Sequence, residues 1–135
     1  TIAAGCCIHR HDALVQSNGA YALGKLLETF QEGLEADDDN IEDEDGTASE
    51  TTRESTAIQR TTSAEFRIQC VYNELLECRV IETTVRSITD HFDTVTRGNA
   101  CHFLRIVTDG SDAARAAASE CGGAEALIEC MKEQA

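Results

Sequence analysis

The sequence has no tryptophan and no proline, and only two tyrosines and four phenylalanines among its 135 residues. Large aromatic rings are the usual fillers of sandwich and barrel cores, whereas small and aliphatic side chains suit helices packed closely against helices. The sequence also lacks an apolar run of roughly 18 residues, the least that a membrane-spanning helix needs. These absences predict an all-α protein without a membrane span.

Basic residues are scarce as well, since 11 lysines and arginines face 25 acidic residues and the formal net charge is −14. Excess acid repels a phosphate backbone, which argues against nucleic-acid binding. Nine of the acids lie between Glu35 and Glu50, in "EADDDNIEDEDGTASE", which contains no base. We weigh two interpretations of this segment, a solvated loop and an arm that attracts a basic partner. The partner-binding candidates of such an arm are Asp37, Asp38, Asp39, Glu42, Asp43, Glu44 and Asp45.

The cysteine count is odd, and the first residues, "TIAAGCCIHRHD", lack the charged start, apolar stretch and cleavage site of a signal peptide. The seven cysteines are Cys6, Cys7, Cys70, Cys78, Cys101, Cys121 and Cys130. Most of them stand among apolar residues, where a free thiol behaves as a small hydrophobe. We therefore expect free, mostly buried thiols in a cytoplasmic or nuclear protein. The chain begins at Thr1 rather than Met, which we interpret as the start of a fragment or of a processed chain.

The short motifs that mark catalytic and metal sites are missing. There is no G-x-S-x-G elbow, no glycine-rich phosphate loop and no HExxH helix. The cysteines lack the C-x2-C spacing of structural zinc sites. In "DDDNIEDEDG", taking Gly46 as the glycine of an EF-hand loop places Ile41 at the first ligand position. We therefore expect no enzymatic activity, no metal site and no cofactor.

A pair of glycines, Gly122-Gly123, separates two helical patterns near the C-terminus. Glycine adopts the left-handed backbone conformation that ends a helix and redirects the chain. When "SNGAYALGKLLE" (Ser17 to Glu28) is laid over "CGGAEALIECMK" (Cys121 to Lys132), Gly19 pairs with Gly123. Self-similarity of this kind is typical of repeat proteins, and chance similarity of two alanine-rich helices is the alternative. The alignment predicts structural hinges at Gly19, Gly122 and Gly123.

Three helices are predicted in the C-terminal part of the chain. The first covers Gly98 to Val107 and ends in Thr108 to Gly110. Ser111 is the expected cap of a second helix from Asp112 to about Glu120, since its side-chain oxygen accepts from free backbone N–H groups. The third follows the glycine pair, and its predicted buried face consists of Ala124, Leu127, Ile128 and Met131.

This part of the chain resembles the armadillo repeat family. The residues that carry the resemblance are "VTRGNACHFLRIVTDGSDAARAAASECGGAEALIECMK" (Val95 to Lys132), with an Asn-Ala-Cys opening, a Gly-Ser-Asp linker and a Gly-Gly hinge. The stretch from Ala3 to Glu28 resembles a shortened copy. The resemblance implies a right-handed α-solenoid of about three repeats, with HEAT-type repeats as the alternative for the middle. The implied organisation is a truncated first repeat (1–32), an acidic insertion (33–60), a divergent middle repeat (61–94) whose long first helix is "SAEFRIQCVYNELLECRV", and a last repeat (95–135).

The resemblance also implies a function, namely a protein-interaction module that serves as scaffold or adaptor. Members of the family bind extended peptides in a concave groove lined by their third helices. The corresponding partner-binding candidates here are Tyr21, Lys25, Glu28, Glu125, Glu129 and Lys132. The groove asparagines and tryptophans of the import-receptor branch are absent, which argues against a nuclear-import role. The alternative is a non-catalytic structural subunit of a large assembly.

Overall fold

The computed structural model describes residues 1–39 and 65–134, and within these ranges the chain forms helices joined by short turns, with no strand. The helices are α1 (Ile2–Ile8), α2 (Ala13–Asp39), α4 (Val80–Asp90), α5 (Thr94–Gly110), α6 (Asp112–Glu120) and α7 (Gly123–Gln134). Residues 65–77 form a further helix between α2 and α4. The all-α fold class predicted from the composition is confirmed.

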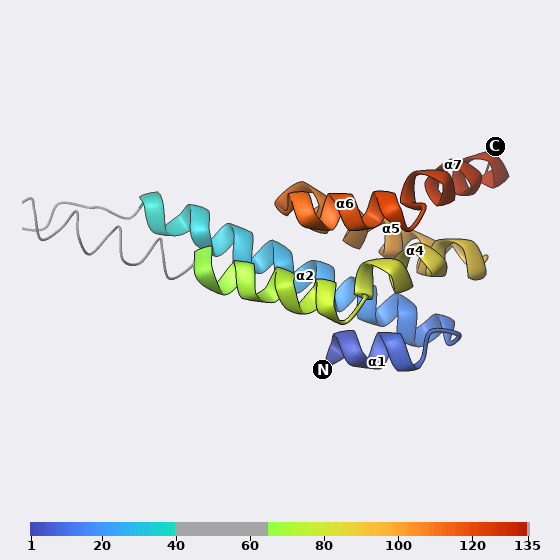
Figure 1. The fold of residues 1–135 in the computed structure, drawn as a ribbon, viewed down its shortest axis with the longest axis horizontal. Coiled ribbons are helices and arrows are strands. Elements are labelled where there is room, and N and C mark those ends of the chain that lie inside the picture. The colour runs from blue at the N-terminus through green and yellow to red at the C-terminus, as the bar shows by residue number, and fades with distance from the viewer. Residues whose placement is uncertain (40–64, 135) are drawn as a thin grey trace, which may run out of the picture.

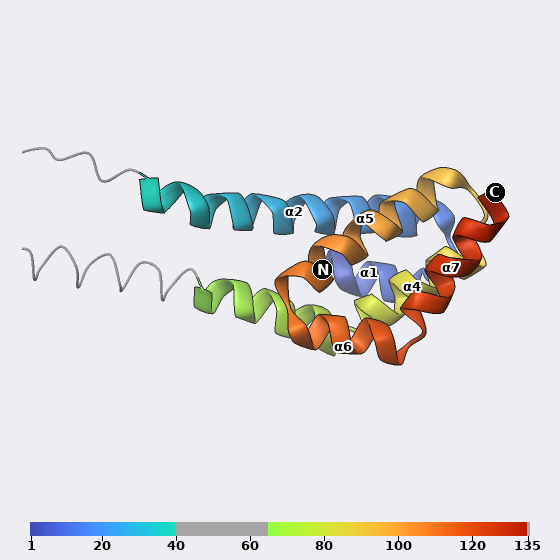
Figure 2. The same ribbon diagram turned by 90° about the horizontal axis from the view of Figure 1, so that it is seen from above.

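The helices are arranged in two neighbouring rows. In one row α2 runs along α5, and this is the most extensive helix pair in the described part of the chain (Figures 1 and 2). In the other row α4 lies between α1 and α7 (Figure 1) and also packs against α5 and α6. The C-terminal part of α2 and the helix at 65–77 extend in the same direction beyond the other helices.

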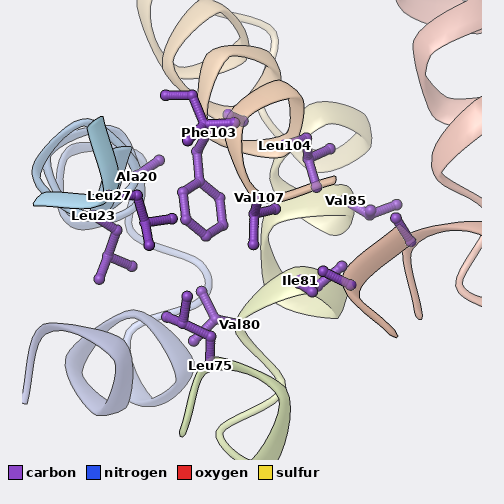
Figure 3. Close-up of a cluster of buried hydrophobic side chains, with 14 of the residues drawn as sticks. Ala20, Leu23, Leu27, Leu75, Val80, Ile81, Val85, Phe103, Leu104 and Val107 are labelled. Carbon is purple, nitrogen blue, oxygen red and sulfur yellow. The ribbon is translucent and has the colours of Figure 1, made fainter. Parts of the chain in front are cut away.

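The core lies where α2, α4 and α5 meet. Phe103 and Val107 of α5 are fully buried at its centre, and small and aliphatic side chains surround them (Figure 3). The surrounding residues labelled there are Ala20, Leu23, Leu27, Leu75, Val80, Ile81, Val85 and Leu104. This composition fits a sequence without tryptophan, because small and aliphatic residues let helices approach closely.

Side-chain caps fix where several helices begin. The carboxylate of Asp93 accepts a hydrogen bond of 2.8 Å from the backbone N–H of Thr96 at the start of α5. The hydroxyl of Ser111 accepts one of 3.2 Å from the N–H of Ala114, so Ser111 caps α6 as predicted. A cap satisfies backbone donors that the first turn of a helix leaves free.

Two turns between helices depend on left-handed backbone. Gly122, between α6 and α7, has a φ of +82°. Arg79, between the helix at 65–77 and α4, has a φ of 54° although it carries a side chain. Gly123 is the first residue of α7 and is buried against Ala118, so its role is close packing.

Gly19 is not a hinge, which corrects the sequence alignment. It lies inside α2, which continues unbroken from Ala13 to Asp39, and Gly122 is the glycine with positive φ in the described residues. A Cβ on Gly19 would overlap the Sγ of Cys6 on α1. Glycine is therefore accommodated here because it allows α1 to approach α2, and the turn between them is formed earlier, at residues 9–12.

Other predicted boundaries shift for similar reasons. The acidic insertion was expected from residue 33, but α2 runs on to Asp39; residues 40–60 of that insertion lie outside the described residues. The first helix of the last repeat starts at Thr94 rather than Gly98, because Asp93 caps it, and it includes Thr108 to Gly110. The long helix predicted for the middle repeat ends at residue 77, before the turn at Arg79.

The buried face of α7 also differs from the predicted one. Ala126 and Cys130 are buried and Leu127 is half-buried, whereas Ile128 and Met131 are exposed. Small residues on the inner face let α7 lie close to α4 and α6, and this turns the larger apolar side chains outward.

Candidate interaction surface

The pairing of α2 with α5 builds a surface that carries several polar contacts between helices. The side-chain amide of Asn99 on α5 donates to the backbone oxygen of Ser17 at 3.2 Å and to its hydroxyl at 2.9 Å. About two helical turns further on, a Cβ added to Gly24 of α2 would meet His102 and Ile106 of α5 at ordinary contact distance. These contacts hold the two helices side by side and bring their exposed side chains into register.

A charged cluster lies on the exposed edge of this pair. Glu28 accepts from Lys25 Nζ at 2.7 Å through Oε2 and lies 3.1 Å from His102 Nε2 through Oε1. Arg105 of α5 lies close enough to Glu28 to act on its charge, and Tyr21, which is half exposed, lies one turn before Lys25. We call these five residues the α2–α5 cluster.

The charges of the α2–α5 cluster stabilise one another. The hydrogen bond from Lys25 lowers the pKa of the Glu28 carboxyl, burial opposes this effect, and the nearby charges of Lys25 and Arg105 lower the pKa by smaller amounts. The same hydrogen bond raises the pKa of Lys25. Glu28 therefore stays ionised and Lys25 stays protonated at neutral pH. The cluster offers cationic donors, a carboxylate acceptor and an aromatic ring within one exposed area.

The second set of predicted partner-binding residues lies elsewhere. Glu125, Glu129 and Lys132 are exposed on α7, and Glu129 pairs with Lys132 at 2.8 Å. Since α7 packs against α4 and α6, this set is not brought together with the α2–α5 cluster.

The acidic candidates cannot be placed as a site. Asp37, Asp38 and Asp39 form the last residues of α2. Glu42, Asp43, Glu44 and Asp45 lie outside the described residues, as do the side chains of the first three.

Sequence reasoning missed His102 and Arg105 of the cluster. They stand three residues apart on one face of α5, but their relevance depends on which helix lies next to α5. One sequence signal could have revealed the pairing of α2 with α5, namely the spacing of apolar positions that the two helices share. These positions are Ala20, Leu23 and Leu27 in α2 and Ala100, Phe103 and Val107 in α5, and all of them are buried.

A buried arginine was also missed, and it ties the start of α5 to the end of α7. Arg97 Nη1 donates to Glu133 Oε2 at 2.6 Å, and its Nε donates to the backbone oxygen of His91 at 2.7 Å. The guanidinium lies 4.9 Å from the centre of the exposed Phe92 ring. The hydrogen bond to Glu133 raises the pKa of Arg97, against a smaller effect of burial. Arg97 holds helices together, and its own side chain is too enclosed to serve as a contact surface.

The remaining reactive side chains of the molecule are its thiols. In the structure the seven cysteines are free: Cys6 and Cys130 are buried, Cys70 is exposed and the others are half-buried. Burial raises the pKa of Cys6, Cys101 and Cys121, which keeps these thiols protonated. Within residues 1–39 and 65–134, no three His, Cys, Asp or Glu side chains converge to hold a metal ion. Among the helices of that part, none has the length and apolar character to cross a membrane.

Comparisons with models of protein families, with curated proteins and with solved structures found no match to this chain. The function must therefore be argued from the geometry alone.

Proposed function

We propose that this chain is a segment of an α-solenoid of the armadillo or HEAT type and acts as a protein-interaction module. The first support is a junction that occurs twice. Glu77-Cys78 precedes Arg79, and Glu120-Cys121 precedes Gly122; both third residues have positive φ, and a helix follows each of them. A turn that recurs with the same Glu-Cys pair, followed by a residue with positive φ, is typical of repeats.

The stacking of matching helices gives the second support. α4 and α7, the helices that follow the two junctions, pack against each other. α2 and α5, which share their pattern of buried positions, also pack against each other. In a solenoid, each repeat buries its apolar face against the same elements of the next repeat. The match of α2 with α5 replaces the alignment of Gly19 with Gly123.

The α2–α5 cluster is the proposed contact surface for the partner. Lys25 and Arg105 would donate to carboxylates or backbone oxygens, and Glu28 would accept from backbone or basic groups. Tyr21 adds a half-exposed ring, a residue type enriched at protein interfaces. The arrangement suits an extended protein segment, because Lys25, Glu28 and Arg105 combine donors and an acceptor on two neighbouring helices. The single observation that carries the proposal is the joining of Lys25, Glu28 and His102 across two matching helices.

The test compares two variants with equal changes of charge. Lys25→Ala/Arg105→Ala removes two cations from the cluster, while Lys132→Ala/Arg115→Ala removes two exposed cations from α6 and α7. Pull-down of partners by the whole chain, with mass spectrometry, is expected to lose at least one partner with the first variant only. The affinity of the Lys25→Ala/Arg105→Ala variant for that partner is expected to fall by about tenfold or more, because two charge-assisted hydrogen bonds are lost. Equal partner sets for both variants, with unchanged circular dichroism, would contradict the proposal.

A second candidate is a non-catalytic structural subunit, wedged in a larger assembly. The observation that favours it is the exposure of large apolar side chains such as Ile8 (75%) and Phe92 (74%). Size-exclusion chromatography separates the two candidates, since a stable monodisperse chain favours the module and aggregation favours the subunit. We propose no catalytic activity for either candidate, and the cytoplasmic or nuclear location stays a prediction.

A further inference from the structure

An exposed apolar stripe on α7 repeats a stripe that is buried on α4. Counting from the two junctions, Ile81, Val85 and Ile88 of α4 correspond to Ala124, Ile128 and Met131 of α7. The α4 residues are 2%, 4% and 1% exposed. On α7, Ala124 is exposed, Ile128 is 47% exposed and Met131 is 63% exposed. Among residues 1–39 and 65–134, the α7 stripe is thus a copy of an internal interface without its cover.

The molecule itself shows what covers such a stripe. Ile81 and Val85 lie on the side of the core away from α2 (Figure 3), and the helices that contact α4 beyond them are α6 and α7. Ile81 lines one surface pocket with Ala117 of α6 and with Cys121, which follows α6. The buried residues of α6 and α7 are Ala114, Ala118, Ala126 and Cys130. The cover is therefore a pair of helices with small residues on its contact face, into which branched side chains fit.

A free surface with the same chemistry exists at the other end of the rows. The groove between α1 and α2 has a volume of about 410 Å³. Half of its lining residues are small, namely Gly5, Cys6, Gly19 and Ala22. Ile2 and Leu14 stand at its edges and are 44% and 69% exposed. The groove thus offers small residues to the stripe, as α6 and α7 do to α4.

α7 carries an excess of negative charge, and the groove end does not. α7 has three glutamates and one lysine. The groove end has one cation, Arg10, and one acid, Asp12, whose carboxylate accepts hydrogen bonds from the backbone N–H groups of Leu14 and Val15. In a chain with a net charge of −14, this is the end that an acidic helix would approach with least repulsion.

We infer that the α7 stripe of one copy docks in the α1–α2 groove of a second copy, so that copies of this chain associate head to tail. Such a contact joins two different surfaces of the same molecule, and it generates open chains unless the rotation between copies closes a ring. One helix face in one groove is smaller than a standard interface, so the association is expected to be weak and to depend on concentration. The inference rests on the repeat arrangement of the proposed function, but not on the α2–α5 cluster.

Two single substitutions block the two halves of the contact. Ile128→Glu places a charge in the stripe, and Gly5→Glu places one in the groove, where a Cβ meets nothing within 4 Å of its own chain. Leu14→Glu is a second groove variant at an exposed position. Phe66→Glu, on an exposed apolar residue of the helix at 65–77, is the matched control.

Sedimentation velocity of the whole chain at rising concentration is the measurement. The unmodified chain and Phe66→Glu are expected to grow beyond dimers, and each blocked variant is expected to stay monomeric, with association weakened at least about tenfold by the buried charge. An equimolar mixture of Ile128→Glu and Gly5→Glu is expected to form a dimer and nothing larger, because one intact stripe meets one intact groove.

Three results would overturn the inference. A chain that stays monomeric at every concentration, with full helicity, would assign the stripe to another protein or to a further repeat of a longer chain. Association that Ile128→Glu abolishes while both groove variants leave it unchanged would indicate a symmetric contact between two α7 helices. A mixture of blocked variants that stays monomeric would exclude the head-to-tail geometry. Lys25→Ala/Arg105→Ala is expected to associate normally, so failure of the partner surface and failure of this contact are distinguishable.

Discussion

The close approach of α1 to α2 at Gly19 can be tested by a double-mutant cycle with Cys6. In Gly19→Ala the added methyl would overlap Sγ of Cys6, a residue that is 4% exposed. Overpacking of this kind costs about 1–3 kcal/mol, while replacing a glycine within a helix by alanine stabilises by about 1 kcal/mol. Gly19→Ala is therefore expected to lower the free energy of unfolding by about 0–2 kcal/mol.

Cys6→Ala alone removes one buried sulfur and is expected to cost about 1 kcal/mol, as the loss of a methylene-sized group does. In Cys6→Ala/Gly19→Ala the new methyl fills the vacated space, so the clash disappears and the gain in helix propensity remains. The double variant should be about as stable as the unmodified chain, which corresponds to a favourable coupling of about 1–3 kcal/mol.

Urea unfolding followed by circular dichroism measures each corner of the cycle. Gly24→Ala, on the same helix, is the control, because its Cβ would meet His102 Cδ2 at an ordinary 3.5 Å. That substitution should stabilise by up to about 1 kcal/mol. A hinge glycine would behave differently: alanine at Gly19 would be penalised whether or not Cys6 is present. Zero coupling would therefore refute the account of Gly19 given above.

Two further predictions concern α7 and α5. Gly123→Val should destabilise the fold by about 1–3 kcal/mol, since its Cβ would lie 2.8 Å from the backbone oxygen of Ala118. Gly98→Ala is the control, because its Cβ would meet nothing within 4 Å. Equal thermal unfolding midpoints for the two variants would show that the junction can accommodate the added side chain. The second prediction is a pH dependence from Asp93, whose pKa is lowered by hydrogen bonds from the side chain and the backbone of Thr96. Because the folded-state pKa lies below the unfolded value of about 4, the stabilisation is present above that value and is lost as the pH falls through the folded-state pKa. Asp93→Asn keeps a capping oxygen but does not titrate, so its unfolding midpoint should depend less on pH in that window. An unchanged pH profile would show that Asp93 is not the source of the pH dependence.

The helices and several of their ends were predictable because they depend on neighbours in sequence. Ser111 caps α6 through the N–H of Ala114, three residues along, and Gly122 ends α6 by its own backbone freedom. The absence of tryptophan and proline pointed to an all-α core for reasons of packing that hold for any arrangement of the helices. Local signals of this kind can be read without knowing which helix packs against which.

The continuity of α2 could not be predicted in this way. In the sequence, Gly19-Ala20 matches Gly123-Ala124 at the glycine break, and glycine is compatible both with a break and with the inside of a helix. The structure decides between them by placing Cys6 of α1 where a side chain of residue 19 would be. Arg79 is the opposite case, since a residue that usually avoids positive φ occupies a turn that glycine forms at Gly122. Composition therefore marks where turns are easy, and packing decides where they occur.

The candidate site shows the same limit. Lys25 and Glu28 were found because they lie three residues apart on one helix, whereas His102 joins Glu28 only through the pairing of α2 with α5. The apolar stripes of α4 and α7 show most clearly that burial depends on neighbouring helices. Val85 and Ile128 occupy matching positions after matching junctions, yet the first is buried and the second is 47% exposed. Their sequences do not explain this difference, since isoleucine is the more apolar of the two. Val85 is buried because α6 and α7 lie beside α4. We expect Ile128 to become buried where a helical pair of the same kind lies beside α7. The sedimentation of the two blocked variants tests this expectation.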